Sequence, residues 1–238
     1  MHEQDVPGPR GAWTAIEGAT AIVTGASSGI GHATAVALHE RGAKIVVASR
    51  SVERLQPVAE QVGGIAVACD VGDYDQVQRL VDRTVAWGGK LDIMINNAGY
   101  GAFGLLHEVD PDRAADMVRT NIIGVINGIR AAGEVLVRQG HGGAIVNVSS
   151  IVGEFPDPGS GVYASSKAAV DLLSRTAFRE LRDHGVHVVN VKPALTDTRF
   201  SATSRGDTGR RMGGDPPEKV ARWICEALES GSATAGYR

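Results

Sequence analysis

The side chains best suited to proton transfer are a tyrosine and a lysine that lie four residues apart. Tyr163 and Lys167 open a strongly helical stretch, and residues at this spacing share one face of a helix. A free phenol, with a pKa of about 10, exchanges its proton poorly near neutral pH. A nearby ammonium group stabilises the tyrosinate and lowers that pKa. The pair therefore predicts an acid/base group tuned by a positive charge, the plainer interpretation being a surface pair on a helix.

Two further polar side chains could assist this chemistry. Ser150 lies thirteen residues before Tyr163, just after an apolar stretch of strand character, and Ser149 beside it is the rival for the same role. Asn121 lies in the preceding helical stretch, where its amide could instead bond to the helix backbone. A hydroxyl or amide that donates to a reacting oxygen stabilises the charge that develops there. These residues would add a substrate-orienting hydrogen bond to the acid/base pair.

A glycine-rich turn joins the first predicted strand to the first predicted helix. Its sequence over residues 24–31 is TGASSGIG, and at this position glycine lets backbone amides approach a pyrophosphate at the helix N-terminus. The spacing alone is a weak signal because the chain contains 31 glycines, but the strand, turn and helix in succession favour a dinucleotide. The alternative is a turn that holds no ligand. The residues predicted to line the phosphates are Gly25, Ser27, Ser28, Gly29, Ile30 and Gly31.

The end of the second predicted strand bears on the choice of cofactor. Dinucleotide-binding domains that use NAD place an acidic residue near this point, where it binds the ribose 2′-hydroxyl. This chain has Ser49 and Arg50 instead. A serine hydroxyl can donate to a 2′-phosphate, and an arginine can pair with it. We therefore expect NADP(H) to be preferred, with NAD(H) as the alternative.

Short apolar stretches alternate with longer stretches of helical period along the chain, which is the pattern of repeated βα units. The predicted strands cover 21–24, 44–49, 65–69, 91–95, 144–148 and 187–191. The predicted helices cover 29–41, 52–61, 74–87, 113–139, 163–184 and 217–230. The fold class is therefore α/β: a single doubly wound Rossmann domain with a central parallel β-sheet flanked by helices on both faces.

Composition and charge restrict the number of domains, the partners and the cellular location that we expect for the protein. The chain has 238 residues, 43% hydrophobic and 21% charged, so we expect one folded domain at 18–238 after a flexible arm at 1–17. The motifs above would make it a catalytic, NAD(P)-binding domain. The net charge of −3 predicts no nucleic-acid partner and no anionic membrane partner. No apolar run approaches the roughly 20 residues of a membrane span. Two isolated cysteines and seven histidines without metal-ligand spacing indicate a cytoplasmic protein without a disulfide or metal.

The order of the motifs resembles the classical short-chain dehydrogenase/reductase family. The turn has the family's G-x-x-x-G-x-G spacing, and the residues at 96–99 match its N-N-A-G element. The family's spacing to Tyr163 favours Ser150 over Ser149 as the catalytic serine. Asp70-Val71 resembles the adenine-side pair. Residues 193–198 resemble the P-G-x-V-x-T element beside the nicotinamide, with two departures, Ala194 for glycine and Thr196 for the aliphatic residue.

The resemblance implies a role for each member of a catalytic tetrad. Tyr163 would be the general acid/base, tuned by Lys167. Ser150 would orient the substrate oxygen, and Asn121 would support the proton relay. The implied activity is that of an oxidoreductase that transfers hydride between NADP(H) and a carbonyl or secondary alcohol. The implied assembly is a homotetramer or homodimer that pairs the long helices predicted at 113–139 and 163–184.

The resemblance also implies a set of cofactor contacts and a pocket for a small-molecule substrate. Besides the phosphate-lining residues, the cofactor contacts are Ser49, Arg50, Asp70, Val71, Asn97, Ala98, Gly99, Tyr163, Lys167, Pro193, Thr196 and Thr198. The predicted pocket residues are Tyr100, Phe103, Phe155, Pro156, Leu195 and Phe200.

Three questions stay open at the level of sequence. The polar segment 197–217 is either a mobile lid or an ordinary surface loop. The chain ends soon after its last helix, so the family's closing strand is expected to be short or absent. The whole protein could also be a non-catalytic NADP(H)-binding sensor or scaffold. The complete tetrad argues against that alternative because a pure binder has no chemical need for all four side chains.

Overall fold

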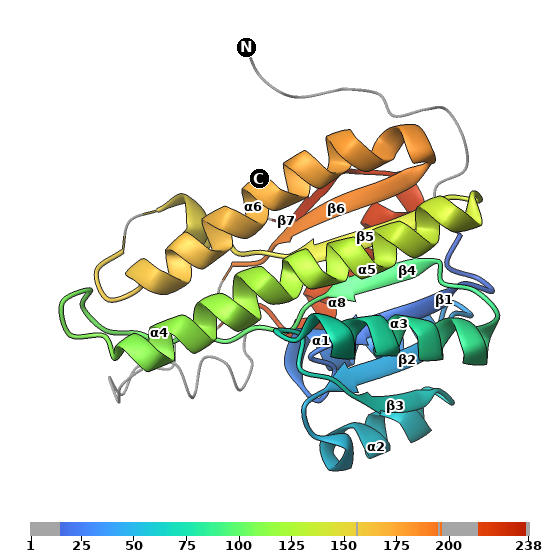
Figure 1. Cartoon of the computed structure of the whole chain (residues 1–238), viewed down its shortest axis with the longest axis horizontal. Helices are drawn as coiled ribbons and strands as arrows, with labels where there is room; N and C mark the ends of the chain where they lie inside the picture. Colours follow the sequence, from blue (N-terminus) through green and yellow to red (C-terminus); the bar gives the residue numbers. More distant parts are fainter. Residues whose placement is uncertain (1–14, 156, 195, 197–213, 237–238) are drawn as a thin grey trace.

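The computed structural model describes residues 15–155, 157–194, 196 and 214–236, which form three layers with a β-sheet in the middle (Figure 1). The sheet has seven strands in the order β3-β2-β1-β4-β5-β6-β7, and each neighbouring pair is parallel. The strands are β1 (Thr20–Thr24), β2 (Lys44–Ser49), β3 (Ile65–Ala68), β4 (Ile93–Asn96), β5 (Gly143–Val148), β6 (Val186–Lys192) and β7 (Thr234–Gly236).

Helices cover both faces of the sheet (Figure 1). One face packs against α1 (Gly29–His39), α2 (Val52–Gln61) and α8 (Pro217–Ser230). The other face packs against α3 (Tyr74–Gly88), α5 (Gly124–Gln139) and α6 (Gly161–Leu181). A short helix, α4 (Pro111–Val118), runs through a π-helical turn (Arg119–Ile123) into α5. Two 3₁₀ turns cover Ile151–Glu154 and Arg182–His184. Within the described part of the chain, no helix combines the length and apolar character needed to cross a membrane.

The strands bury side chains on both faces, which explains why they are almost uniformly apolar. In β1, Ile22 packs into the core beneath α3, α5 and α6, whereas Ala21 and Val23 pack into the core beneath α1, α2 and α8. Successive strand residues point to opposite faces, so a sheet covered on both sides favours apolar residues in the interior of each strand, and the lysines of β2 and β6 stand at strand ends. The doubly wound α/β fold predicted from the sequence is confirmed.

The structure refines some predicted boundaries. The helix expected from residue 113 begins at Pro111, because the Asp110 carboxylate accepts hydrogen bonds from the first backbone amides and proline suits the first helical position. The closing strand is short, since β7 has three residues. Ile16, only 4% exposed, already packs into the core. The first 14 residues of the predicted arm lie outside the described residues, so the arm and domain boundaries stay predictions.

Candidate active site

The order of the strands reverses direction beside β1, whose neighbours are β2 and β4. In doubly wound sheets a ligand crevice forms at the carboxyl ends of the strands at such a point. The Thr24 hydroxyl joins the two sides of this crevice: it donates to the Ile95 carbonyl at 3.0 Å and accepts from the backbone amides of Asn97 and Ala98 at 3.0 and 3.1 Å. The glycine-rich turn after β1 is thereby held against the chain that leaves β4.

Close packing within this turn explains two of its glycines. The Asn97 amide group donates to the carbonyl oxygens of Thr24 at 2.9 Å and Gly25 at 3.4 Å. Gly25 has φ +66°, and a Cβ there would lie 2.8 Å from the Ala98 Cα. A Cβ on Gly31 would lie 2.5 Å from the Gly25 carbonyl oxygen. Asn97, predicted as a cofactor contact, therefore also holds the phosphate-side turn in shape.

The start of α1 fits a dinucleotide pyrophosphate. Helix α1 begins at Gly29, and Ser28 before it has an extended backbone and makes no side-chain capping bond. The first amides of a helix lack partners within the helix, and the helix dipole places partial positive charge there. Uncapped amides at the switch point of the sheet are the donor set that binds nucleotide phosphates in this fold.

The residues expected around the adenosine lie on neighbouring loops after β2 and β3. The Ser49 hydroxyl donates to the Ser51 carbonyl at 3.1 Å. Arg50 is exposed, and no ion pair to it is found among the described residues. The Asp70 carboxylate accepts from the Gly72 amide at 2.9 Å and lies 3.8 Å from the guanidinium of Arg119. The loop after β3 is thus fixed, while the Arg50 side chain forms no ion pair within the described part of the chain.

The loop after β3, which contains Asp70 and Val71, also contacts α5. Val71 is 7% exposed, and its carbonyl oxygen accepts a hydrogen bond from the buried Asn127 side chain at 2.8 Å. A Cβ on Gly124 would lie 2.5 Å from the Val71 side chain. Val71, one of the two residues expected on the adenine side, therefore packs directly against α5, the helix that follows Asn121.

Tyr163 and Ser150 contact each other near the carboxyl end of β5. Tyr163, 8% exposed, lies in the first turn of α6, and Ser150 follows β5. Burial raises the pKa of Tyr163 to about 12, and a side-chain hydrogen bond with Ser150 acts in the opposite direction. The serine hydroxyl thus already contacts the phenol whose proton the chemistry would use.

Lys167 lies on the same face of α6 as Tyr163, one turn further along. Its ammonium nitrogen is 5.8 Å from the centroid of the Tyr163 ring and donates to the Val148 carbonyl oxygen at 2.9 Å. The side chain is 6% exposed. Burial lowers the pKa of Lys167 to about 8, and the negative charge of Asp171 opposes that change. Lys167 is therefore a buried cation whose pKa lies only a little above neutral pH.

Asn121 lies in the π-helical turn. The plainer interpretation of the sequence was that its side-chain amide bonds to the backbone of its own helix, but the side chain bonds elsewhere. Its amide oxygen accepts from the Tyr100 amide at 3.0 Å, and its amide nitrogen donates to the Tyr100 carbonyl at 2.9 Å and to the Ser166 hydroxyl at 3.1 Å. Gly99 lies between Asn121 and Lys167, because a Cβ there would be 3.0 Å from the amide oxygen and 3.7 Å from the ammonium nitrogen. Asn121 thus connects the loop after β4 to α6.

Ser149 and Ser150 have different surroundings. The Ser149 hydroxyl is directed away from Tyr163, toward the Lys167 carbonyl oxygen at 3.2 Å and the Asp171 carboxylate. Ser150 caps the start of the 3₁₀ turn, where its hydroxyl accepts from the Val152 amide at 3.3 Å and lies 3.5 Å from the Pro193 carbonyl oxygen. The geometry favours Ser150 for substrate contact.

Only part of the predicted substrate and nicotinamide side can be described. The Phe103 ring packs on the Tyr163 ring with a centroid distance of 5.6 Å. The Pro193 carbonyl accepts from the Ile151 amide at 3.1 Å. Thr196 is 8% exposed, and its hydroxyl donates to the Ala194 carbonyl at 3.1 Å. The predicted residues that lie outside the described residues are Pro156, Leu195, Thr198 and Phe200, with the segment 197–213 of the proposed lid.

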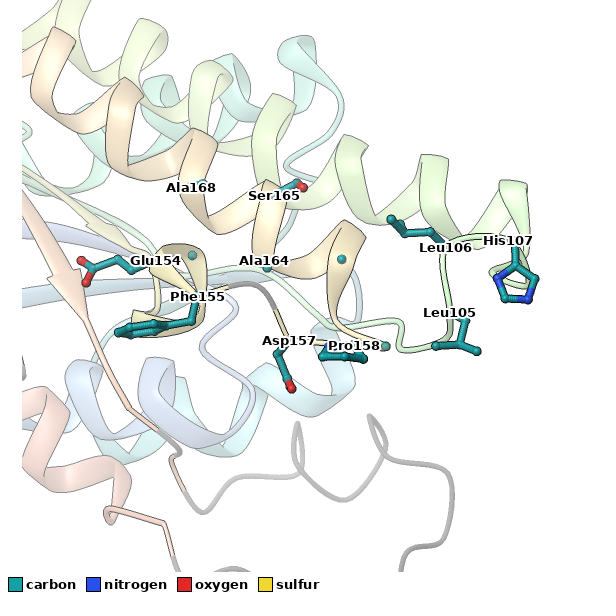
Figure 2. A pocket seen from close by; sticks show the side chains of 13 residues that line it. Leu105, Leu106, His107, Glu154, Phe155, Asp157, Pro158, Ala164, Ser165 and Ala168 are labelled. Carbon is teal, nitrogen blue, oxygen red and sulfur yellow. The ribbon is translucent and has the colours of Figure 1, made fainter.

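A cavity of about 640 Å³ opens on another side of α6 (Figure 2). Its lining includes Leu106, Phe155, Ala164 and Ala168, but not Tyr163 or Lys167. Positions 164 and 168 are one residue beyond 163 and 167, which turns them about 100° around the helix. Phe155, predicted as a substrate contact, therefore lines this outer cavity and is 60% exposed.

Sequence reasoning missed a group of charged side chains behind Lys167. Asp171, Lys192 and Glu154 form consecutive ion pairs there. The spacing of Asp171, four residues after Lys167 on the same helix face, was a signal that could have revealed the first of them. Lys192 ends β6 and Glu154 ends the 3₁₀ turn after β5, and no local pattern connects either of them to α6.

Comparison with known proteins agrees with the motif order. The family model described as short chain dehydrogenase matches residues 19–209. An uncharacterized oxidoreductase of Staphylococcus aureus is 34% identical over 211 residues, which covers 87% of this chain and 90% of the relative. Two crystal structures are 28% identical to the chain. An alcohol dehydrogenase of Thermococcus sibiricus complexed with 5-hydroxy-NADP has a TM-score of 0.82, with 92% of this chain and 94% of that chain covered. A short chain dehydrogenase/reductase of Burkholderia phymatum in complex with NAD has a TM-score of 0.86, with 93% and 89% covered.

Proposed function

The chain belongs to the classical short-chain dehydrogenase/reductase family of oxidoreductases, and we propose that it transfers hydride between NADP(H) and a ketone, aldehyde or secondary alcohol. The observation that carries the proposal is the contact between Ser150 and the buried Tyr163 hydroxyl, with the Lys167 ammonium 5.8 Å from the tyrosine ring. A phenol, a hydrogen-bond donor and a fixed cation are what carbonyl reduction requires.

In the proposed reaction each side chain has one task. A bound NADPH would supply the hydride that the carbonyl carbon receives. Tyr163 gives its proton to the carbonyl oxygen, and Ser150 donates a hydrogen bond to the same oxygen as it becomes negative. Lys167 stabilises the tyrosinate left behind until it is reprotonated from solvent. Asn121 holds the Tyr100 backbone and the Ser166 hydroxyl, so it keeps the loop after β4 in place beside the lysine.

The choice of NADP(H) over NAD(H) rests on the loop after β2. An exposed arginine without an ion-pair partner in the described part of the chain can form charge-assisted bonds with a 2′-phosphate. No carboxylate stands at Ser49 or Arg50 to repel that phosphate. Solved relatives carry either an NADP derivative or NAD, so the cofactor preference is a property to be measured on this chain.

The proposal extends to the setting and assembly of the protein. Cys69 and Cys225 are both buried thiols, and burial raises their pKa values to about 12 and about 11, so neither is primed for disulfide exchange. This supports a cytoplasmic location. Self-association through α5 and α6 is supported by apolar side chains that these elements expose, among them Ile126 and Leu172.

A carbonyl screen tests the proposed function. Purified protein is mixed with NADPH and a panel of ketones and aldehydes, and loss of NADPH absorbance is followed. We expect turnover with at least one small or medium apolar carbonyl, and a turnover lower by about 10² to 10⁴ with Tyr163→Phe. NADPH binding without turnover across the panel, at equal levels in the wild type and Tyr163→Phe, would favour the non-catalytic NADP(H)-binding sensor or scaffold.

A further inference from the structure

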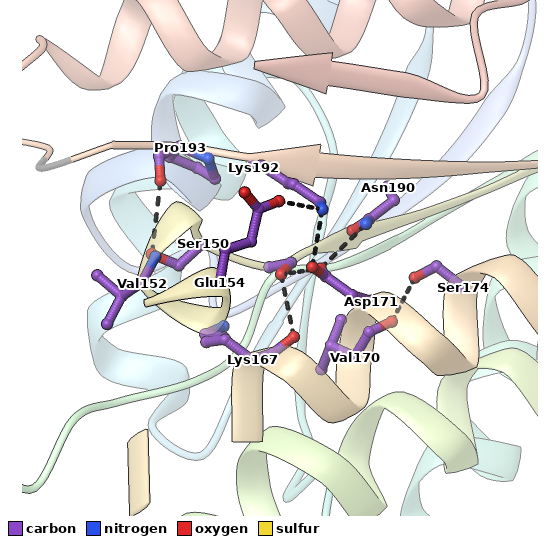
Figure 3. A network of polar contacts seen from close by, with 11 residues as sticks. Ser150, Val152, Glu154, Lys167, Val170, Asp171, Ser174, Asn190, Lys192 and Pro193 are labelled. Carbon is purple, nitrogen blue, oxygen red and sulfur yellow. Dashed lines mark hydrogen bonds and ion pairs between the residues drawn. The ribbon is translucent and has the colours of Figure 1, made fainter. Parts of the chain in front are cut away.

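A buried carboxylate lies one helical turn beyond Lys167 on α6. Asp171 is 9% exposed, and three side chains donate to it (Figure 3). The Ser149 hydroxyl and the Asn190 amide, the latter at 3.0 Å, contact one carboxylate oxygen. The Lys192 ammonium contacts the other oxygen at 2.8 Å. All three donors come from the carboxyl-end halves of β5 and β6 or the residues just after them.

The partners of Asp171 stand next to the proposed catalytic and cofactor-binding residues. Ser149 precedes Ser150, and Lys192 precedes Pro193, whose carbonyl oxygen accepts from the Ile151 amide. Lys192 also pairs with Glu154 in the 3₁₀ turn at 2.7 Å. One carboxylate therefore joins the helix that carries Tyr163 to both strand ends that face the proposed nicotinamide site.

Stability alone is a weak explanation for this arrangement. A buried ion pair loses much of its attraction to the cost of removing both charges from water, and well-packed apolar side chains often replace such pairs without loss. Asp171 also carries a negative charge close enough to Lys167 to oppose the fall in the lysine pKa on burial. Among the described residues, the other charged groups with a contact leading to Asp171 are Lys192 from β6 and, through it, Glu154 from the 3₁₀ turn.

We infer that Asp171 is a positioning residue for the proposed hydride transfer. Its carboxylate fixes the Ser149–Ser150 and Lys192–Pro193 segments against α6, and its charge keeps the Lys167 ammonium protonated at the working pH. Asp171 acts through these neighbours and does not touch the substrate. The inference rests on the proposed function, because its consequences are read in the reaction of Tyr163 and Lys167.

Two substitutions with opposite electrostatic signs test the inference. Asp171→Asn keeps the size of the side chain and removes the negative charge, so Lys167 should lose its proton at lower pH. Lys192→Met removes a neighbouring positive charge and leaves the carboxylate, so Lys167 should keep its proton to higher pH. Carbonyl reduction needs protonated Tyr163 together with charged Lys167. Because the lysine pKa is about 8 and the tyrosine pKa about 12 before substrate binds, the basic limb of the kcat/KM profile, which reports the groups of the free enzyme, should report the lysine.

The expected result is a displacement of that limb by about one pH unit in each variant, downward for Asp171→Asn and upward for Lys192→Met. For Asp171→Asn, kcat at pH 8 should fall by about tenfold or more as the segments lose their alignment, while the KM for NADPH changes by less than about threefold. The matched control is Asp92→Asn. Asp92 is likewise a buried carboxylate, 5% exposed and 3.1 Å from Lys90, but it precedes the central strand β4 and so lies at the amino end of the strands, opposite to the end where the donors to Asp171 lie. The Asp92→Asn variant should unfold at a lower temperature than the wild type, but the basic limb of its pH profile should stay at the wild-type pH.

The outcomes separate the inference from the proposed function. A wild-type enzyme without NADPH-dependent reduction overturns both. An active wild type, with both variants folded and retaining its pH limb and kcat, overturns only the role of Asp171. If Asp171→Asn fails to fold, the pH profile of Lys192→Met tests the inference by itself. A basic limb displaced to higher pH supports the inference, and a limb at the wild-type pH or at lower pH contradicts it.

Discussion

The ammonium nitrogen of Lys167 lies 2.9 Å from the carbonyl oxygen of Val148, the last residue of β5. This bond fixes a cation from the helix to the end of a central strand, one turn from the tyrosine that would exchange protons. Burial lowers the pKa of the lysine to about 8 and raises that of Tyr163 to about 12. In the absence of ligand the two groups are therefore a charged lysine and a neutral phenol at neutral pH, which is the protonation state that carbonyl reduction uses.

Replacing the tyrosine hydroxyl should abolish most of the turnover. Tyr163→Phe keeps the ring that packs on Phe103 but removes the only proton donor proposed for the substrate oxygen. We expect kcat to fall by about 10² to 10⁴, the usual share of general acid/base catalysis. The measurement is initial velocity with NADPH and the best carbonyl from the screen. NADPH affinity and the circular dichroism spectrum should be unchanged; near-normal turnover in a folded variant would refute the assigned mechanism.

Removing the lysine charge should alter the pH profile as well as the rate. Alcohol oxidation needs tyrosinate, and Lys167→Met leaves a buried phenol without the cation that stabilises its anion. Residual oxidation should therefore rise only at higher pH than in the wild type. In the reduction direction the limb near pH 8 should disappear, because no lysine remains to titrate. The family resemblance also implies a bond from this lysine to the nicotinamide ribose, so NADPH affinity should fall. An oxidation profile that keeps the wild-type midpoint would show that Lys167 does not tune Tyr163.

The loop after β2 should control the cofactor preference. Arg50→Ala removes the proposed partner of the 2′-phosphate and should weaken NADPH binding by about tenfold to a hundredfold more than NADH binding. Ser49→Asp places a negative charge where the phosphate would lie and should shift the preference toward NAD(H). Both effects can be measured by fluorescence titration with each cofactor. Equal losses for the two cofactors in Arg50→Ala would remove the basis for the NADP(H) preference.

The sequence predicted the fold well because the fold depends on local signals. Strands β1 to β6 are short apolar stretches, and the glycine turn with its following helix is contiguous in the chain. The pair Tyr163 and Lys167 was also accessible, since one helix turn joins them. The predicted roles of Ser150 and Asn121, by contrast, depended on family spacing, because a serine pair and a lone helical asparagine have several ordinary explanations.

Contacts between distant segments were beyond reach of the sequence. Asn121 bonds to Tyr100 from within a π-helical turn, and no periodicity distinguishes such a turn from the continuous helix expected at 113–139. The cluster of Asp171, Lys192 and Glu154 comes from three elements whose ends meet only in the folded chain. Asn97 was assigned to the cofactor, whereas its bonds to Thr24 and Gly25 give it a structural task too.

The apolar side chains on α6 and the turn before α5 bear on the last prediction, which concerns assembly. Leu172 on α6 is 59% exposed, and Ile123 and Ile126 are 41% and 38% exposed. We predict that these side chains contribute to a surface that another protein chain covers, and the family resemblance implies that the covering chain is a second copy of this one.

We therefore expect a homotetramer, or failing that a homodimer, in light scattering at micromolar concentration. Leu172→Glu should reduce the measured mass, because an isologous interface would place the new charge twice in an apolar contact. The control is Val52→Glu on α2, a similarly apolar exposed position, 36% exposed, that lies on the other face of the sheet (Figure 1). It should leave the mass unchanged. A wild-type protein that remains monomeric, or a Leu172→Glu variant with wild-type mass, would contradict assembly through these helices.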